Sequence, residues 1–129
     1  MLHWWPILSW FRNKSRRPPQ ELTKHIIRFV GEQDGASERD LKSSLVEVFL
    51  REPTVRRAYL ARTDYRDTTG VHVALCVKSS VGVCHELKSK VFDIFSSMFG
   101  SHEHLDVLFI RDDQEQELGQ VCRPFYRAE

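Results

Sequence analysis

The chain lacks the features that mark several broad classes of protein. It has no apolar run approaching the roughly 20 residues that a membrane-spanning helix needs. Its three cysteines, Cys76, Cys84 and Cys122, are odd in number and form no CxxC pair, which fits a reducing compartment better than a disulfide framework. It also has no glycine-rich phosphate loop, internal repeat or low-complexity tract. These absences argue against a membrane-spanning, disulfide-rich or repeat protein.

The net charge of the chain is small, but the charged residues are unevenly distributed along it. The net charge is +1, yet residues 1–17 contain four basic side chains and no acidic one, which leaves the remainder at −3. A chain of 129 residues that is 41% hydrophobic can bury a single core. The pair Pro18-Pro19 interrupts the chain. We therefore expect an aromatic and basic tail over residues 1–19 and one folded domain over residues 20–129.

The tail places three tryptophans, Trp4, Trp5 and Trp10, ahead of the basic cluster from Arg12 to Arg17. This order is the reverse of a secretory signal, in which positive charge precedes the apolar stretch. Indole rings followed by cations are typical of a shallow interfacial membrane anchor. A tail packed on the domain or on a partner is the preferred alternative, and a misassigned start codon is a third interpretation.

Hydrophobic periodicity predicts two helices in the domain. One lies between Ser37 and Pro53, with Ser37 and Asp40 resembling a capping box, and the other runs from Cys84 to Gly100. Short β-branched or alternating runs predict strands over residues 25–30, 55–63, 71–77 and 105–110. The order strand, helix, strand, strand, helix, strand predicts an α+β fold. We expect a βαββαβ ferredoxin-like sandwich, with an antiparallel sheet and two helices on one face.

The end of the chain is unusually apolar. Pro124 precedes two adjacent aromatic residues, Phe125 and Tyr126, where most chain ends are polar and frayed. The preferred interpretation is a C-terminal strap in which both rings pack back onto the domain. An exposed recognition tail remains the alternative.

Two segments carry residue types used in catalysis or metal binding. His102, Glu103 and His104, with Asp106 nearby, could ligate zinc, but no further ligand stands at a suitable spacing, so a solvated loop is favoured. The pair Cys84-His85 opens the second predicted helix, where a thiol could be activated, although no base or orienting group can be assigned to it. Cys76 falls within a predicted core strand and should be buried.

Basic residues cluster around the second predicted strand. With Tyr59 they could hold a nucleic acid backbone, but the closely spaced aromatics of RNA-binding sheets are missing and the domain is net acidic. Solvated arginines at a strand edge, which discourage pairing between sheets, explain them as well. The arginines concerned are Arg56, Arg57, Arg62 and Arg66.

Several of these segments resemble, in order, the C-terminal domain of the enhanced serine sensitivity protein family (SseB). The resemblance spans roughly residues 22–127. It implies a cytoplasmic bacterial accessory domain without established catalytic residues, and the domain that usually precedes this one in the family is missing. The segments that carry it are Ile26 to Glu32, the helix ending at Glu52-Pro53, Val55 to Leu60, Leu105-Asp106-Val107 and Pro124-Phe125-Tyr126.

We therefore expect a non-catalytic accessory domain that acts as a protein-interaction module. The expected contact residues are Trp4, Trp5, Trp10, Phe125 and Tyr126. The alternative is a regulatory domain that senses a small molecule such as an amino acid, since βαββαβ layouts also serve that role. No cofactor, metal or nucleic acid is expected. The location is expected to be cytoplasmic, with peripheral membrane contact through the tail left open, and the oligomeric state is not predicted.

The anchor interpretation of the tail predicts binding to anionic vesicles. Each cation near an anionic surface contributes about 1 kcal/mol, so four should contribute about 4 kcal/mol. Binding should weaken with salt, shift tryptophan fluorescence to the blue, and be much weaker on neutral vesicles. Deleting residues 1–17 should abolish it. Vesicle binding that survives the deletion would exclude the anchor, and a destabilised domain would place the tryptophans in its packing.

Overall fold

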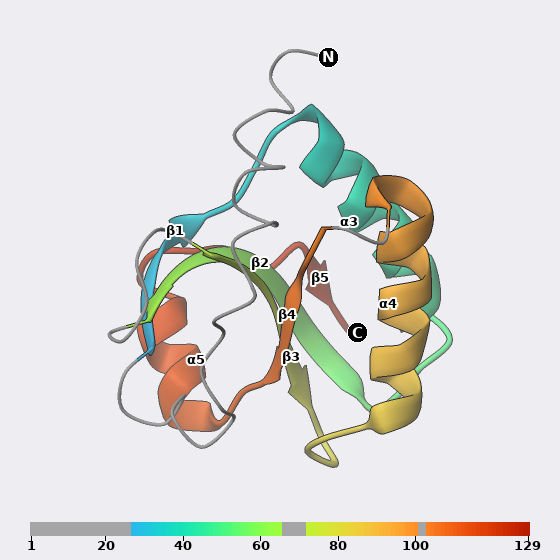
Figure 1. Ribbon diagram of the computed structural model, residues 1–129. Coiled ribbons are helices and arrows are strands. Elements are labelled where there is room, and N and C mark those ends of the chain that lie inside the picture. The colour runs from blue at the N-terminus through green and yellow to red at the C-terminus, as the bar shows by residue number, and fades with distance from the viewer. Residues whose placement is uncertain (1–26, 66–71, 101–102) are drawn as a thin grey trace.

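The computed structural model describes residues 27–65, 72–100 and 103–129 (Figure 1). The α+β class expected from the sequence is confirmed. The described elements, in chain order, are β1 (Ile27–Glu32), α3 (Ala36–Phe49), β2 (Val55–Tyr65), β3 (His72–Ser79), α4 (His85–Phe99), β4 (Asp106–Phe109), α5 (Asp112–Leu118) and β5 (Tyr126–Arg127).

The sheet differs from the expected ferredoxin-like sandwich. Its strand order is β1-β2-β3-β4, with the short β5 also paired to β2. Strands β1, β3 and β5 run antiparallel to β2, but β4 runs parallel to β3, so the sheet is mixed. The reason is the crossover through α4, which returns the chain to the end of the sheet where β3 began and lays β4 directly beside it.

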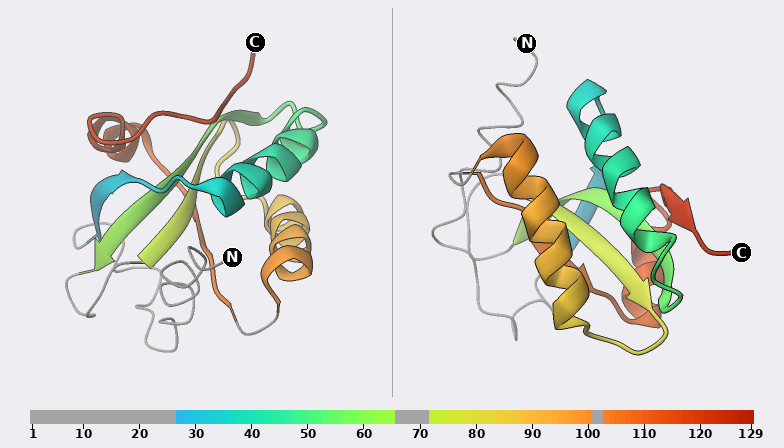
Figure 2. Two further views of the ribbon diagram at one scale, coloured as in Figure 1. Left: turned by 90° about the horizontal axis from the view of Figure 1, so that it is seen from above. Right: turned by 90° about the vertical axis from the view of Figure 1, so that its right-hand side faces the viewer.

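Two layers of apolar side chains lie on opposite faces of the sheet. Helices α3 and α4 cover one face together, as expected, and α5 lies on the other (Figures 1 and 2). The larger core contains Leu41, Leu45 and Phe49 of α3 and Leu87, Val91 and Phe95 of α4, at the helical spacing that predicted both helices. The smaller core includes Phe29, Tyr59, Ala74, Ile110 and Leu118.

The start of α3 depends on a glycine instead of the expected Ser37 cap. Gly35 is the N-cap, and Ser37 lies inside the helix, where its hydroxyl donates to the buried carboxylate of Glu38 at 3.3 Å. The side-chain amide of Gln33 donates to the other oxygen of the same carboxylate. A Cβ atom at position 35 would lie 2.5 Å from Glu38 Oε1, so any other residue there would force the Glu38 carboxylate to shift.

The C-terminal residues form the strap that the sequence predicted. Tyr126 belongs to β5, and the Phe49 ring centroid lies 5.4 Å from that of Tyr126 and 6.1 Å from that of Phe125. The backbone amide of Phe125 donates to the Ala58 carbonyl at 2.9 Å. The interpretation of a packed strap is thus confirmed. Both rings are partly buried by the domain itself.

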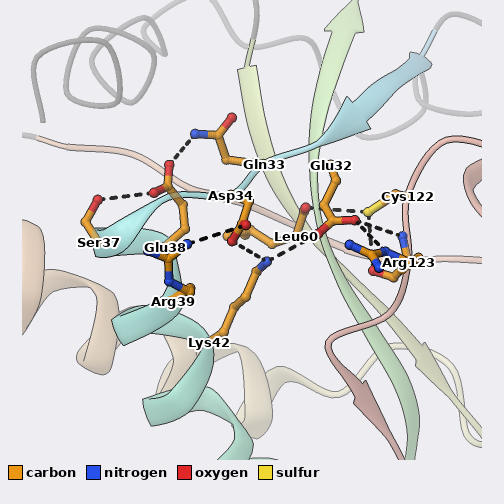
Figure 3. A network of polar contacts seen from close by, with 10 residues as sticks. All are labelled: Glu32, Gln33, Asp34, Ser37, Glu38, Arg39, Lys42, Leu60, Cys122 and Arg123. Carbon is orange, nitrogen blue, oxygen red and sulfur yellow. Dashed lines mark hydrogen bonds and ion pairs between the residues drawn. The ribbon is translucent and has the colours of Figure 1, made fainter. Parts of the chain in front are cut away.

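Charged contacts fasten the strap to the turn between β1 and α3 (Figure 3). Arg123, just before Pro124, points its Nε atom at Glu32 Oε1 across 3.4 Å. Lys42 of α3 lies 3.4 Å from Asp34 and 3.9 Å from Glu32, and its Nζ atom is 5.9 Å from the centroid of the Phe125 ring. Lys42 therefore joins the β1–α3 turn, α3 and the strap through one cation.

We predict that Tyr126→Ala lowers the free energy of unfolding by about 1–2 kcal/mol, because it removes a partly buried ring from Phe49. Urea denaturation monitored by circular dichroism measures the change. The matched control is Arg127→Ala on the same strand, whose side chain is exposed and should change stability by less than about 0.5 kcal/mol. Equal effects of the two substitutions would contradict a strap held by its aromatic rings.

Candidate functional site

Among the described residues, strand β4 forms one edge of the sheet, and part of its backbone faces outward there. Its strand neighbour among the described residues is β3 alone. The amide of Ile110, just past β4, donates to the Val77 carbonyl of β3 at 3.0 Å. Because hydrogen-bonding direction alternates along a strand, the amide and carbonyl groups of Val107 and Phe109 point away from β3. No strand within the described ranges pairs with β4 on that side.

A small hollow of about 120 Å³ lies beside this edge. Its lining combines the loop before α4 and the first turns of α4 with β4 and the start of α5. Because α4 and α5 cover opposite faces of the sheet, a hollow lined by both must open at the sheet edge. Of the described residues that line the hollow, three have basic or imidazole side chains and none has an acidic one. The lining residues are Val83, His85, Lys88, residues 107–109, Arg111 and Gln114.

The other described edges of the sheet are better protected against a further strand. Strand β1 carries a bulge between Phe29 and Gly31, and Arg28 on it forms an ion pair with Asp64 at 3.0 Å. Strand β5 is only two residues long. Bulges, charges and short length are the usual protections of an edge strand, and residues 107–109 of β4 contain no charge and no proline. Edge β4 is therefore the described edge most open to pairing.

Apolar side chains are exposed at the same end of the sheet. Val81 and Val83, in the loop between β3 and α4, are 63% and 60% exposed, and Val83 also lines the hollow. The hollow, the loop and the outward amides of β4 together give one surface with hydrogen-bonding, cationic and apolar parts. We call this surface the β4 edge site.

The candidate nucleophile Cys84 is not assembled into a catalytic centre by the described residues. Cys84 is the N-cap of α4, and the next residue, His85, is exposed and lines the hollow, but Cys84 itself does not line it. Cys76 is completely buried, as expected, and burial raises the pKa of its thiol. Burial also raises the pKa of the Cys122 thiol to about 12, so both of these thiols stay protonated near neutral pH.

The structure corrects the expectation of a solvated loop around His104. Asp106 is only 4% exposed, and its two carboxylate oxygens contact different partners: Oδ1 lies 2.7 Å from His104 Nε2, and Oδ2 accepts from the Tyr65 hydroxyl at 2.9 Å. Burial, and then the Asp106 charge, raise the pKa of Tyr65 well above its ordinary value, so the phenol remains a donor. The cluster bonds the ends of β2 and β4 together. Among the described residues, no group of three or more metal-ligating side chains converges.

The arginines of β2 are also not at a strand edge, because β2 is an interior strand of the sheet. Arg56 is exposed and Arg62 is partly buried. Arg57 donates to both carboxylate oxygens of Glu115 on α5, with 2.9 Å between Nη2 and Oε1, and the Tyr59 hydroxyl donates to the same carboxylate at 2.7 Å. Arg57 therefore anchors α5 to the sheet.

Some of the expected site residues lie outside the described part of the chain. They are Trp4, Trp5, Trp10, Arg66 and His102, together with the predicted boundary between residues 19 and 20. Sequence reasoning missed Lys88, Arg111 and Gln114, which come together only because α4 and α5 both begin beside β4. None of the helices formed by the described residues combines the length and apolarity needed to cross a bilayer.

Comparison with known proteins finds no matching family model, no matching curated protein and no matching solved structure.

The contact between Arg57 and Glu115, which anchors α5 to the sheet, predicts a loss of stability in acid. The hydrogen bond from Arg57 holds the pKa of Glu115 below its ordinary value of 4.5. A carboxyl group with a lowered folded-state pKa stabilises the fold fully above the unfolded-state pKa, and this contribution disappears as the pH falls below it. At pH 7, Glu115→Gln should therefore cost about 1–2 kcal/mol, and the difference from the unsubstituted protein should shrink below about pH 4.5.

Urea denaturation over a pH series measures both effects. Glu117→Gln is the matched control, since it removes the same charge from an exposed position on the same helix. The anchor would be refuted if Glu115→Gln and Glu117→Gln gave the same pH profile.

Proposed function

We propose that this domain is a non-catalytic protein-interaction module that binds an extended segment of a partner protein along the outer edge of β4. The observation that carries the proposal is the outward orientation of the Val107 and Phe109 backbone groups beside the hollow. A partner strand placed there would extend the sheet by hydrogen bonds to those groups. This is the recognition mode of domains that bind peptides by strand addition.

The side chains around β4 suit such a partner. Val107 and Phe109 belong to the larger core on the α4 side, whereas Leu108 and Ile110 belong to the smaller core on the α5 side. Side chains of an added strand would alternate in the same way, facing Val83 and Lys88 on one side and Arg111 on the other. Backbone pairing would supply affinity, and these side chains would supply specificity.

A role as an accessory domain like the C-terminal domain of SseB proteins stays a proposal that rests on the ordered sequence segments alone. It agrees with a binding function, because that resemblance implies no catalytic residues. A protein partner fits an open sheet edge better than an enclosed ligand pocket.

Amino-acid sensing is the second candidate, and the size of the hollow favours it. A space of about 120 Å³ with Lys88 and Arg111 in its lining could hold the carboxylate of a small metabolite. An amino acid also carries an ammonium group, however, and none of the described lining residues has an acidic side chain. The charge pattern therefore supports binding of an anionic group that belongs to a larger partner.

We predict that Phe109→Pro abolishes peptide binding without disrupting the sheet. Proline removes the outward amide of residue 109 and places its ring at the edge, but it breaks no hydrogen bond to β3. The probe is a set of linear peptides selected from a random display library on the full chain. Phe109→Pro should weaken their binding at least tenfold, and peptide addition should slow hydrogen exchange at the Val107 and Phe109 amides.

The matched control is Phe109→Ala, which loses the same side chain but keeps the amide and should retain most of the binding. Selected peptides that bind Phe109→Pro as well as Phe109→Ala would overturn the proposal. Free serine provides the contrast with sensing: it should not raise the thermal midpoint of the protein, whereas a rise that Lys88→Ala abolishes would favour the sensor instead.

A further inference from the structure

The hollow beside β4 is lined by basic and imidazole side chains from the starts of two helices, which cover opposite faces of the sheet. His85 and Lys88 come from the first turns of α4, and Arg111 comes from the residue that precedes α5. Gln114 is buried beneath them, and its side-chain oxygen accepts from the Arg111 amide at 2.9 Å, which fixes the start of α5 beside the hollow.

The acidic residues nearby leave much of this positive charge available. Arg111 holds Asp113 in a two-point ion pair, at 3.0 and 2.9 Å, but the Asp113 side chain is 70% exposed and does not line the hollow. Lys88 Nζ lies 5.9 Å from the centroid of the Phe92 ring. Within residues 27–65, 72–100 and 103–129, no carboxylate forms an ion pair with His85 or Lys88.

The position of these side chains relative to β4 determines what they can contact. An added strand runs about 4.8 Å from β4, and its side chains point alternately toward the α4 side and the α5 side. A side chain on the α4 side, opposite Val107 or Phe109, would face His85 and Lys88. The exposed Val83 lines the same hollow and would contact its apolar part.

We propose that the hollow is a subsite for the carboxylate of an Asp or Glu side chain in the partner segment, held chiefly by Lys88 with Arg111 and His85 around it. This inference rests on the strand addition proposed above. The charge complementarity is specific: the described part of the lining offers Lys88 and Arg111 and no acidic group, so a basic side chain at this position would be repelled.

A charge reversal tests the subsite. Peptides are selected from the same random library on the full chain, on Lys88→Glu, and on Lys90→Glu. Lys90 is exposed on the same helix and does not line the hollow, so its reversal makes the same change in net charge. The unsubstituted chain and Lys90→Glu should both enrich Asp or Glu at one position of the peptide. Lys88→Glu should lose that preference and enrich Lys or Arg there.

Synthetic peptides give the size of the effect. Replacing the enriched acid by its amide should weaken binding to the unsubstituted chain about threefold to tenfold, as expected for a partly exposed ion pair, and should have little effect on binding to Lys88→Glu. The dependence on the acid should also decrease at high salt.

The two proposals fail in different ways. Peptides that are blocked by Phe109→Pro but show no acidic preference, or respond equally to Lys88→Glu and Lys90→Glu, would overturn the subsite and leave strand addition in place. No enriched peptides, or peptides that ignore Phe109→Pro, would overturn strand addition and the subsite with it. Enrichment of apolar residues alone at every position would likewise overturn the carboxylate subsite.

Discussion

The fold depends on the register of strand β2. This strand pairs with β1, β3 and β5, and it contributes Ala58 and Leu60 to one core and Tyr59 and Ala61 to the other. A shift by one residue would exchange the side chains of the two faces, so the register is fixed from both sides. Helices α3 and α4, helix α5 and the C-terminal strap all pack against it. Because β3 is held in turn by β2, the edge at β4 has a fixed position and direction.

The parts that the sequence predicted well are those with a strong local period. Leu41, Leu45 and Phe49 recur at helical spacing and are buried. Leu87 and Val91 of the second helix recur and are buried in the same way. Apolar residues alternate along strand β3, as the sequence predicted. The run Pro124-Phe125-Tyr126 predicted a strap that the fold does contain. The boundaries shifted by a few residues, and the N-cap of α3 moved to Gly35, because side-chain caps compete with tertiary contacts such as those of the Glu38 carboxylate.

The parts that the sequence could not predict depend on contacts between distant residues. Parallel or antiparallel pairing of β4 leaves the alternation of its side chains unchanged, so the pattern could not distinguish a mixed sheet from the ferredoxin-like one. Helix α5 buries only Gln114 and Leu118, too few for a recognisable apolar face. Its anchor joins Arg57 to Glu115, 58 residues apart in the sequence. The same holds for the hollow, whose cations Lys88 and Arg111 come from α4 and from the residue before α5 and meet only in the folded protein.

A comparison of the β4 edge with the strap shows why the β4 edge would suit a partner better than the aromatic residues of the strap. Phe125 and Tyr126 already pack on Phe49, so a partner that used their rings would first have to displace them. The backbone of β4 is already extended, and a strand added there requires no such rearrangement.

The strap itself shows what strand addition to this sheet requires. Strand β5 makes only a few backbone hydrogen bonds with β2, and aromatic packing and the Arg123–Glu32 contact accompany them. A partner at β4, with two outward residues to pair with, would similarly need side-chain contacts, and the hollow and the exposed valines beside it provide them.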